Sequence, residues 1–351
     1  MPTELATVAQ TLVSGGRGVL AIDESTKTCN ARFAKLGIDQ TTEQRRAYRE
    51  LLIAAPGIER YVSGMILYDE TIRQNAADGR SFVELLRERG MVPGIKVDTG
   101  TTPLPFTGGE TITEGLDGLR GRLAEYAALG AGFAKWRAVF TIAGGTPSER
   151  AIRANAQALA RYAALCQESG IVPIVEPEVL ADGEHDLERC AAVTERVLRA
   201  VFAELGEAGV ALEAMVLKPN MVLPGTTSGQ PVTTADVVSA TLRVLGAAVP
   251  VAVAGVAFLS GGQDDRAASE RLCGLNQTAP NRRPWPLTFS YGRALQAAAL
   301  EHWGGREDRV AEARHILVHR AYCNGLAACG AYKAQSEERL ASFPPPVPTA
   351  A

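Results

Sequence analysis

The chain has 351 residues, a formal net charge of −3 and a hydrophobic fraction of 46%. These values are typical of a folded protein and exclude a disordered chain, which would lack the apolar residues to offset its ordering entropy. With 36 Lys and Arg against 39 Asp and Glu, the chain has no excess of positive charge. We therefore expect no nucleic-acid partner.

Other features of the composition indicate a cytoplasmic protein. No apolar run reaches about 18 residues and the first residues contain no signal peptide, so we expect no membrane association. Six cysteines occur singly, without the two-residue spacing of a zinc or redox site. This usage is typical of reduced thiols in the cytoplasm.

Short apolar runs alternate with longer amphipathic stretches along the chain. The apolar runs predict strands at 18–22, 61–67, 91–97, 132–139, 171–175, 212–217, 249–258 and 286–291. The amphipathic stretches predict helices at 44–54, 81–89, 115–130, 147–169, 187–208, 234–247, 265–276 and 306–329.

Eight β-then-α units predict a (β/α)₈ TIM barrel. An open doubly wound sheet also alternates strands and helices, but no Gly-x-Gly-x-x-Gly pattern follows the first predicted strand. We expect residues 1–340 to form one barrel domain. The proline-rich residues 341–351 are expected to form an extended, mobile tail.

Lysine is rare in this chain and is therefore informative. Of the 36 basic residues, 30 are arginine, and the six lysines are Lys27, Lys35, Lys96, Lys135, Lys218 and Lys333. Arginine serves wherever only a cation is needed, whereas a buried lysine can lose its proton and act as a nucleophile.

Three of these lysines lie at the ends of predicted strands, where the catalytic groups of a barrel gather. They are Lys96, Lys135 and Lys218, and Glu176 ends the strand between the last two. An amine in an apolar strand near another cation can attack a ketone to form a Schiff base. Nearby carboxylates, including Asp23 after the first strand, can provide the acid and the base that such a reaction needs.

Glycines and serines follow the last two predicted strands, where barrels often bind phosphate. Glycine lets backbone N–H groups approach an anion, and an arginine there adds a bidentate donor. The residues in question are Ser260, Gly261, Gly262, Ser290, Gly292 and Arg293.

Seven segments together resemble the class I fructose-1,6-bisphosphate aldolases, the metal-free Schiff-base family. They occur in the order of that family between Leu5 and Tyr332. The segments are 20–26 (LAIDEST), 94–98 (GIKVD), 133–137 (FAKWR), 173–178 (PIVEPE), 216–221 (VLKPNM), 258–263 (FLSGGQ) and 287–296 (LTFSYGRALQ).

The resemblance implies a role for each matched residue. Lys218 would form the Schiff base, Glu176 would be the acid and base of carbinolamine formation and dehydration, and Asp23 would act on the C4 hydroxyl. Lys135 would be a second catalytic cation, with Glu178 beside it.

The resemblance also implies contacts with both phosphates of the substrate. Ser260, Gly261, Ser290, Gly292 and Arg293 would hold the proximal phosphate. The distal phosphate and the rest of the substrate site would involve Ser25, Arg32, Lys96 and Arg137.

Four positions depart from the family pattern. A second lysine usual in the family is Thr99 here, a usual small residue is Lys27 and a usual lysine is Ala31. These positions bear on the distal phosphate. The chain ends in Ala351 and has no tyrosine after Tyr332, whereas many animal and plant members end in a tyrosine that assists enamine protonation.

The resemblance implies cleavage of fructose 1,6-bisphosphate, no cofactor or metal, and a homotetramer. Another phosphosugar barrel enzyme, either transaldolase-like or an isomerase, and a non-catalytic aldolase-like scaffold are the alternatives. His315 and His319 have the spacing of two metal ligands on one helix face, but the sequence indicates no third ligand.

Overall fold

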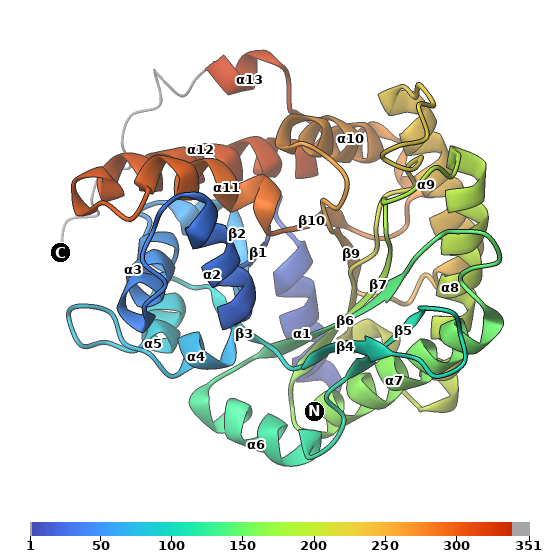
Figure 1. Cartoon of the computed structure of the whole chain (residues 1–351), viewed down its shortest axis with the longest axis horizontal. Coiled ribbons are helices and arrows are strands. Elements are labelled where there is room, and N and C mark those ends of the chain that lie inside the picture. Colours follow the sequence, from blue (N-terminus) through green and yellow to red (C-terminus); the bar gives the residue numbers. More distant parts are fainter. Residues whose placement is uncertain (1, 339–351) are drawn as a thin grey trace.

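The computed structural model describes residues 2–338, so the tail expected at 341–351 lies outside the described residues. Eight parallel strands close into a barrel in the order β1-β10-β9-β8-β7-β6-β3-β2, with the helices outside it (Figure 1). The predicted (β/α)₈ TIM barrel is confirmed.

The bounds of the elements are as follows. The barrel strands are β1 (Gly18–Ala21), β2 (Val62–Leu67), β3 (Val92–Lys96), β6 (Phe133–Phe140), β7 (Val172–Val179), β8 (Val216–Leu217), β9 (Gly255–Phe258) and β10 (Leu287–Tyr291). The helices are α1 (Pro2–Val13), α2 (Thr26–Lys35), α3 (Thr42–Ile53), α4 (Asp69–Ile72), α5 (Phe82–Glu88), α6 (Leu119–Leu129), α7 (Glu149–Glu168), α8 (Leu187–Glu207), α9 (Thr234–Ala248), α10 (Asp265–Gln277), α11 (Arg293–Trp303), α12 (Val310–Ala328) and α13 (Gln335–Glu338). Short 3₁₀ turns lie at η1 (Ile58–Arg60), η2 (Leu212–Ala214), η3 (Pro280–Arg282) and η4 (Glu307–Arg309).

Two predicted strands are shorter in the structure. The run at 212–217 begins with the 3₁₀ turn η2, and only Val216 and Leu217 pair with the neighbouring strands. The run at 249–258 becomes a strand only at Gly255, because Val253 N–H donates to the carbonyl of Pro250 in a turn. Apolar character does not distinguish such turns from a buried strand.

Strand β7 is longer than predicted. It pairs with β6 without interruption from Val172 to Val179, so Glu176 and Glu178 lie within the strand and not after it. Residues two apart in a strand face the same side, so both carboxylates point the same way.

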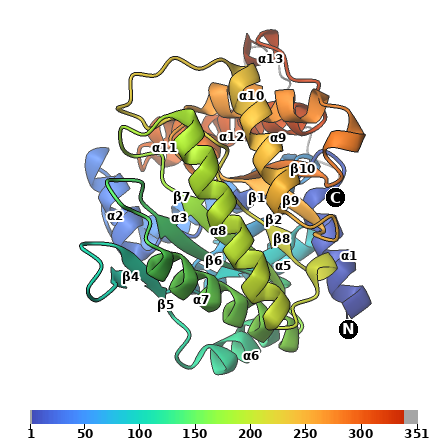
Figure 2. The ribbon, with the colours of Figure 1, turned by 90° about the vertical axis from the view of Figure 1, so that its right-hand side faces the viewer.

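The sequence analysis did not predict α1, α2, α4, α11 and α13, nor a hairpin outside the barrel. The hairpin pairs β4 (Gly100–Pro103) with β5 (Thr111–Glu114) in antiparallel fashion. Figure 2 shows this hairpin and α1 on opposite sides of the barrel.

Helix α1 covers the end of the barrel at which the strands begin. Leu5 and Leu12 of α1 pack in one buried cluster with Val19, Ile66 and Phe133 of the barrel interior. This packing leaves the opposite end, at which the strands finish, available for a functional site.

Candidate active site

A cleft of about 1050 Å³ lies at the carboxyl ends of the barrel strands. Of the fifteen residues predicted to form the site, fourteen line this cleft. These are Asp23, Ser25, Arg32, Lys96, Lys135, Arg137, Glu176, Glu178, Lys218, Ser260, Gly261, Ser290, Gly292 and Arg293.

Gly262 is the exception, since it does not line the cleft. Its φ of 75° lies in the left-handed region, and a Cβ there would come within 2.3 Å of Cβ of Ala181. Gly262 is therefore explained by the turn that follows β9, for which only glycine has the required backbone freedom and space.

Two lysines and two carboxylates form the centre of the cleft. Lys135 Nζ lies 2.7 Å from Oδ2 of Asp23 and 3.3 Å from Oε2 of Glu176. Lys218 Nζ lies 3.2 Å from the other oxygen of Glu176, so this carboxylate separates the two amines. All four side chains are at most 12% exposed.

The electrostatics of this group keep both carboxylates ionised. Burial would raise the pKa of Asp23, but the charges of Lys135, Lys218 and Lys96 outweigh burial and lower the pKa to about 2. Burial likewise opposes ionisation of Glu176, and Lys135, Lys218 and Arg137 lower its pKa below the ordinary value.

The pKa of Lys135 shifts in the opposite direction to that of the two carboxylates. Burial would lower the pKa of Lys135, but Asp23, Glu176 and Asp98 raise it well above that of a free lysine. Lys135 therefore remains an ammonium and cannot be the nucleophile. Because Lys218 contacts only one of these carboxylates, it is the better candidate for the attacking amine.

A second layer of charge surrounds this centre. Arg137 on β6 pairs with Glu178 on β7, and Lys96 at the end of β3 pairs with Asp98 at 2.6 Å. The carboxylate of Asp98 also accepts a hydrogen bond from the backbone N–H of Arg137. Asp98 thus connects two of the cations that reach the cleft.

The cleft wall formed by β9, β10 and α11 has the properties of an anion site. Gly292 caps the N-terminus of α11, where the first N–H groups have no partner within the helix. The Ser290 hydroxyl is buried and makes no hydrogen bond within residues 2–338. A Cβ at Gly261 would approach Oε1 of Glu178 to 2.8 Å, so a larger residue there would displace the Glu178 carboxylate.

Helix α2 forms the facing wall. Ser25 caps this helix by accepting a hydrogen bond from the N–H of Thr28. Arg32 lies one turn before the end of the helix and pairs with Glu24. Ala31 lines the cleft, as does Thr99, whereas Lys27 is exposed and does not.

The sequence analysis assigned no role to Glu24. Its carboxylate accepts hydrogen bonds from Arg32, from buried Arg49 on α3 and from Gln296 on α11. Tyr48 completes this network by donating to Gln296 at 2.7 Å. Only the position of Glu24 directly after Asp23 indicated a role in the sequence.

The fold and the cleft define a barrel enzyme in which two buried lysines lie on either side of one carboxylate. A family model for class-I fructose-bisphosphate aldolase matches residues 4–343. This chain therefore belongs to the class I fructose-bisphosphate aldolases and is a carbon–carbon lyase.

Individual relatives agree with this assignment. The chain is 49% identical over 334 residues to "Fructose-bisphosphate aldolase 4, cytosolic" of Arabidopsis thaliana, covering 95% of this chain and 85% of the relative. It is 50% identical over 331 residues to a "Probable fructose-bisphosphate aldolase class 1" of Xanthomonas campestris pv. campestris, covering 94% and 98%.

A solved structure is also similar. It is fructose-bisphosphate aldolase from Plasmodium falciparum in complex with TRAP and a small-molecule inhibitor, with a TM-score of 0.93 and 49% sequence identity. The match covers 95% of this chain and 96% of that one.

Proposed function

We propose that this aldolase cleaves fructose 1,6-bisphosphate reversibly into glycerone phosphate and glyceraldehyde 3-phosphate through a Schiff base on Lys218. The proposal depends chiefly on Lys218 Nζ lying 3.2 Å from one oxygen of Glu176 while Lys135 lies 3.3 Å from the other. One carboxylate can therefore exchange protons with the nucleophile, and the neighbouring cation favours its ionised form between these transfers.

Proton transfer within this ion pair starts the reaction. Lys218 gives a proton to Glu176, and the neutral amine attacks the C2 carbonyl to form a carbinolamine. Glu176 returns the proton to the departing hydroxyl, so that water leaves and an iminium forms. No external acid is needed.

Cleavage then uses Asp23 as the base. The ionised Asp23 takes the proton of the C4 hydroxyl, the C3–C4 bond breaks and its electron pair moves into the iminium to form an enamine. Lys135, 2.7 Å from Asp23, stabilises the negative charge that develops on the C4 oxygen. Protonation and hydrolysis of the enamine release the second product.

The two walls would bind the two phosphates. Ser260, Gly261, Ser290, Gly292 and Arg293 would hold the proximal phosphate, where a helix N-terminus meets a buried hydroxyl. Ser25, Arg32, Lys96 and Arg137 would line the distal half of the site. Because Ala31 and Thr99 carry no charge, we expect weaker discrimination for the distal phosphate than in members with lysines there.

The chemistry itself requires no metal, because the protonated Schiff base accepts the electron pair released at C3. We also propose a homotetramer in the cytoplasm. Within residues 2–338 no helix is long and apolar enough to cross a bilayer. The name of the Arabidopsis relative specifies the cytosol. Light scattering on the purified protein gives the oligomeric state directly.

Borohydride reduction tests the proposed nucleophile. The protein is mixed with glycerone phosphate and EDTA, reduced, digested and mapped by mass spectrometry. We expect one stable adduct, on Lys218, and none in Lys218→Met, with Lys333→Met as the control for a lysine outside the cleft. An adduct on another lysine, or normal turnover by Lys218→Met, contradicts the assignment.

A further inference from the structure

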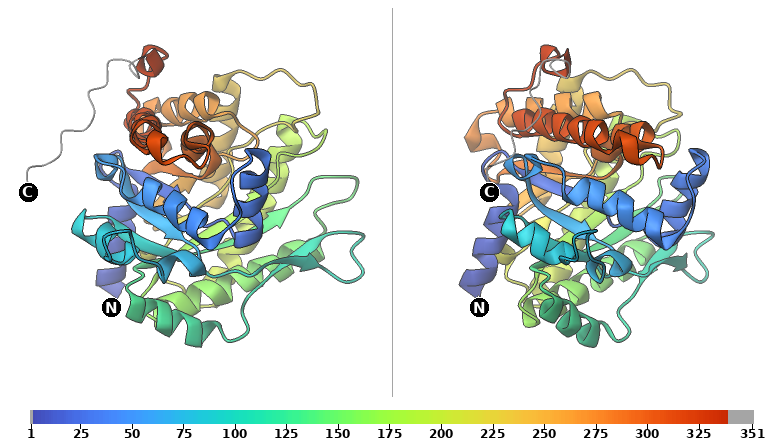
Figure 3. Two further views of the ribbon diagram at one scale, coloured as in Figure 1. Left: turned by 60° about the vertical axis from the view of Figure 1, so that its left-hand side comes forward. Right: turned by 90° about the vertical axis from the view of Figure 1, so that its left-hand side faces the viewer.

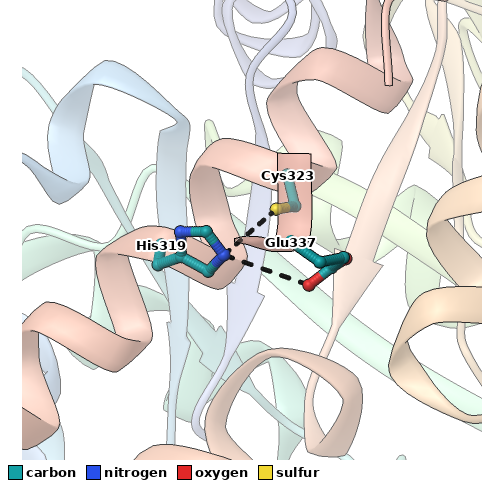
Figure 4. A group of neighbouring side chains, drawn as sticks. All are labelled: His319, Cys323 and Glu337. Atoms are coloured by element: carbon teal, nitrogen blue, oxygen red, sulfur yellow. Dashed lines mark hydrogen bonds and ion pairs between the residues drawn. The ribbon is translucent and has the colours of Figure 1, made fainter. Parts of the chain in front are cut away.

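A buried group of metal-ligand residues lies outside the cleft, on α12 and α13 (Figure 4). His319 and Cys323 are one turn apart on α12, and Glu337 comes from α13. His319 and Cys323 are buried, and the Glu337 side chain is only 10% exposed. None of the three lines the cleft.

The spacing of the three ligand atoms suits a single tetrahedral ion. His319 Nε2 lies 3.6 Å from Cys323 Sγ and 3.9 Å from Oε2 of Glu337, and all three atoms lie within 4.8 Å of one another. Bonds of about 2.0–2.3 Å around zinc place neighbouring ligand atoms about 3.3–3.7 Å apart. The separation of His319 from Cys323 falls within this range, and that of His319 from Glu337 exceeds it by a few tenths of an ångström.

We propose that His319, Cys323 and Glu337 bind a zinc ion at a site separate from the aldolase cleft. Imidazole, thiolate and carboxylate are all zinc ligands, and the soft sulfur disfavours calcium and magnesium. The site ties the last described segment of the chain to α12. Figure 3 shows α13 at the edge of the molecule, beside that helix.

The surrounding charges favour a dication. Arg320 pairs with Glu337 and also lies 3.5 Å from Asp265, so one positive charge faces two carboxylates. One of these two carboxylate charges is therefore not compensated. The thiolate of Cys323 adds a second negative charge to it. A divalent ion neutralises both.

Arg320 orients the carboxylate and does not need to be displaced from it. The phenol of Tyr332 donates to Oε1 of Glu337 at 2.7 Å, and Arg320 contacts both oxygens. Such partners fix a ligating carboxylate and strengthen a metal site. Oε2 is the oxygen nearer His319.

Ion binding has a defined proton balance. The Cys323 thiol gives up its proton when it binds the ion, because the thiolate is the form that ligates a metal. Binding replaces this proton by a sulfur–zinc bond and releases one proton to solvent, with no change of oxidation state.

Cobalt provides the primary test because it reports the sulfur ligand directly. Protein freed of metal by chelator is titrated with Co²⁺ and then with Zn²⁺. We expect a thiolate-to-cobalt charge-transfer band that saturates at one equivalent and is abolished by zinc. Cys323→Ser should lose the band, and His319→Gln should weaken zinc binding by more than about 100-fold, the upper end for losing an outer-shell partner.

Two matched controls separate this site from its neighbours. His315→Ala removes the other histidine that the sequence pairs with His319, and Cys329→Ser removes an exposed thiol at the end of the same helix. Both should keep the band and the one-to-one stoichiometry. No band in the unmodified protein, or loss of the band in Cys329→Ser but not in Cys323→Ser, overturns the proposal.

Trypsin tests whether zinc holds α13 against α12, independently of cobalt and of activity. Lys333 is exposed between α12 and α13, so cleavage after it requires this segment to open. Zinc should slow this cleavage at least tenfold in the unmodified protein and not in His319→Gln. Equal rates of cleavage with and without zinc in the unmodified protein would contradict the proposal that zinc holds α13 against α12.

Discussion

Lys218 and Glu176 form an ion pair in which Nζ lies 3.2 Å from Oε1, in a part of the cleft where both side chains are 5% exposed. An acid and a nucleophile at this separation can exchange a proton directly. This one contact can therefore serve two successive steps of Schiff-base formation, the deprotonation of Lys218 and the return of that proton to the departing hydroxyl.

Glu176→Gln should therefore lower kcat by about 10²–10⁴-fold, because it removes a general acid and base and preserves the shape. The rate of borohydride-trapped imine in a single turnover should fall with kcat. Glu188→Gln, which breaks an exposed ion pair with Arg243 outside the cleft, is the control and should leave the rate of trapping largely unchanged. If the trapping rate is normal in Glu176→Gln, the proton is exchanged elsewhere.

Glu24 holds Arg32 at the distal wall, so its loss should affect binding of that phosphate. Glu24→Gln should raise KM for fructose 1,6-bisphosphate several-fold, while KM for fructose 1-phosphate, which lacks the distal phosphate, changes little. Glu43→Gln breaks an exposed ion pair with Arg46 and serves as the control. Equal increases for both substrates would show that Glu24 acts on the whole site and not through Arg32.

Glu24 also compensates a buried charge. Arg49 is 2% exposed and pairs with Glu24 at 2.8 Å. Glu24→Ala should therefore lower the free energy of unfolding by about 3–5 kcal/mol, the usual cost of leaving a buried charge without its partner. Urea denaturation measures this cost, and Glu24→Ala combined with Arg49→Met should recover part of it. No recovery in the double variant would assign the loss to packing.

The fold and the centre of the site could be predicted from sequence because local patterns encode both. Each barrel strand overlaps a predicted apolar run, and Lys135 and Lys218 stand out because most other basic residues are arginine. Parallel strands end at one side of a barrel, so residues at those ends meet without any knowledge of loop geometry.

Features that depend on distant partners could not be predicted. Glu24 gains its role from Arg49 and Gln296, which are 25 and 272 residues away. In the sequence, His319 has the spacing of a metal-ligand pair with His315. In the structure, the potential ligands near His319 are instead Cys323 and Glu337. Glu337 lies beyond the end of α12, so helical periodicity could not identify it.

Asp23 should stabilise the folded protein in a pH-dependent manner. Its pKa falls from 3.8 to about 2 on folding, so its contribution of about 2 kcal/mol is fully present above pH 3.8 and is lost as pH falls through 2. The difference in unfolding free energy between wild type and Asp23→Asn should therefore shrink between pH 5 and pH 2. Urea denaturation across this range measures it, with exposed Asp39→Asn as the control. A difference that stays constant with pH would mean that the lysines do not lower the pKa of Asp23 in the folded protein.

Gly94 should be essential to the barrel interior because β3 passes directly over an aromatic ring. A Cβ at Gly94 would come within 2.2–2.5 Å of three ring carbons of fully buried Phe133 on the neighbouring strand. Gly94→Ala should lower the unfolding free energy by about 2–3 kcal/mol, since overpacking a close-packed core forces side chains off their rotamers. Gly121→Ala is the matched control, because Gly121 is an exposed residue of α6 with nothing within 4 Å of the added carbon. That substitution should stabilise the protein by about 0.5–1 kcal/mol through helix propensity. Urea denaturation of both variants should therefore give shifts of opposite sign, and a stabilised Gly94→Ala would mean that the Phe133 ring moves aside without cost.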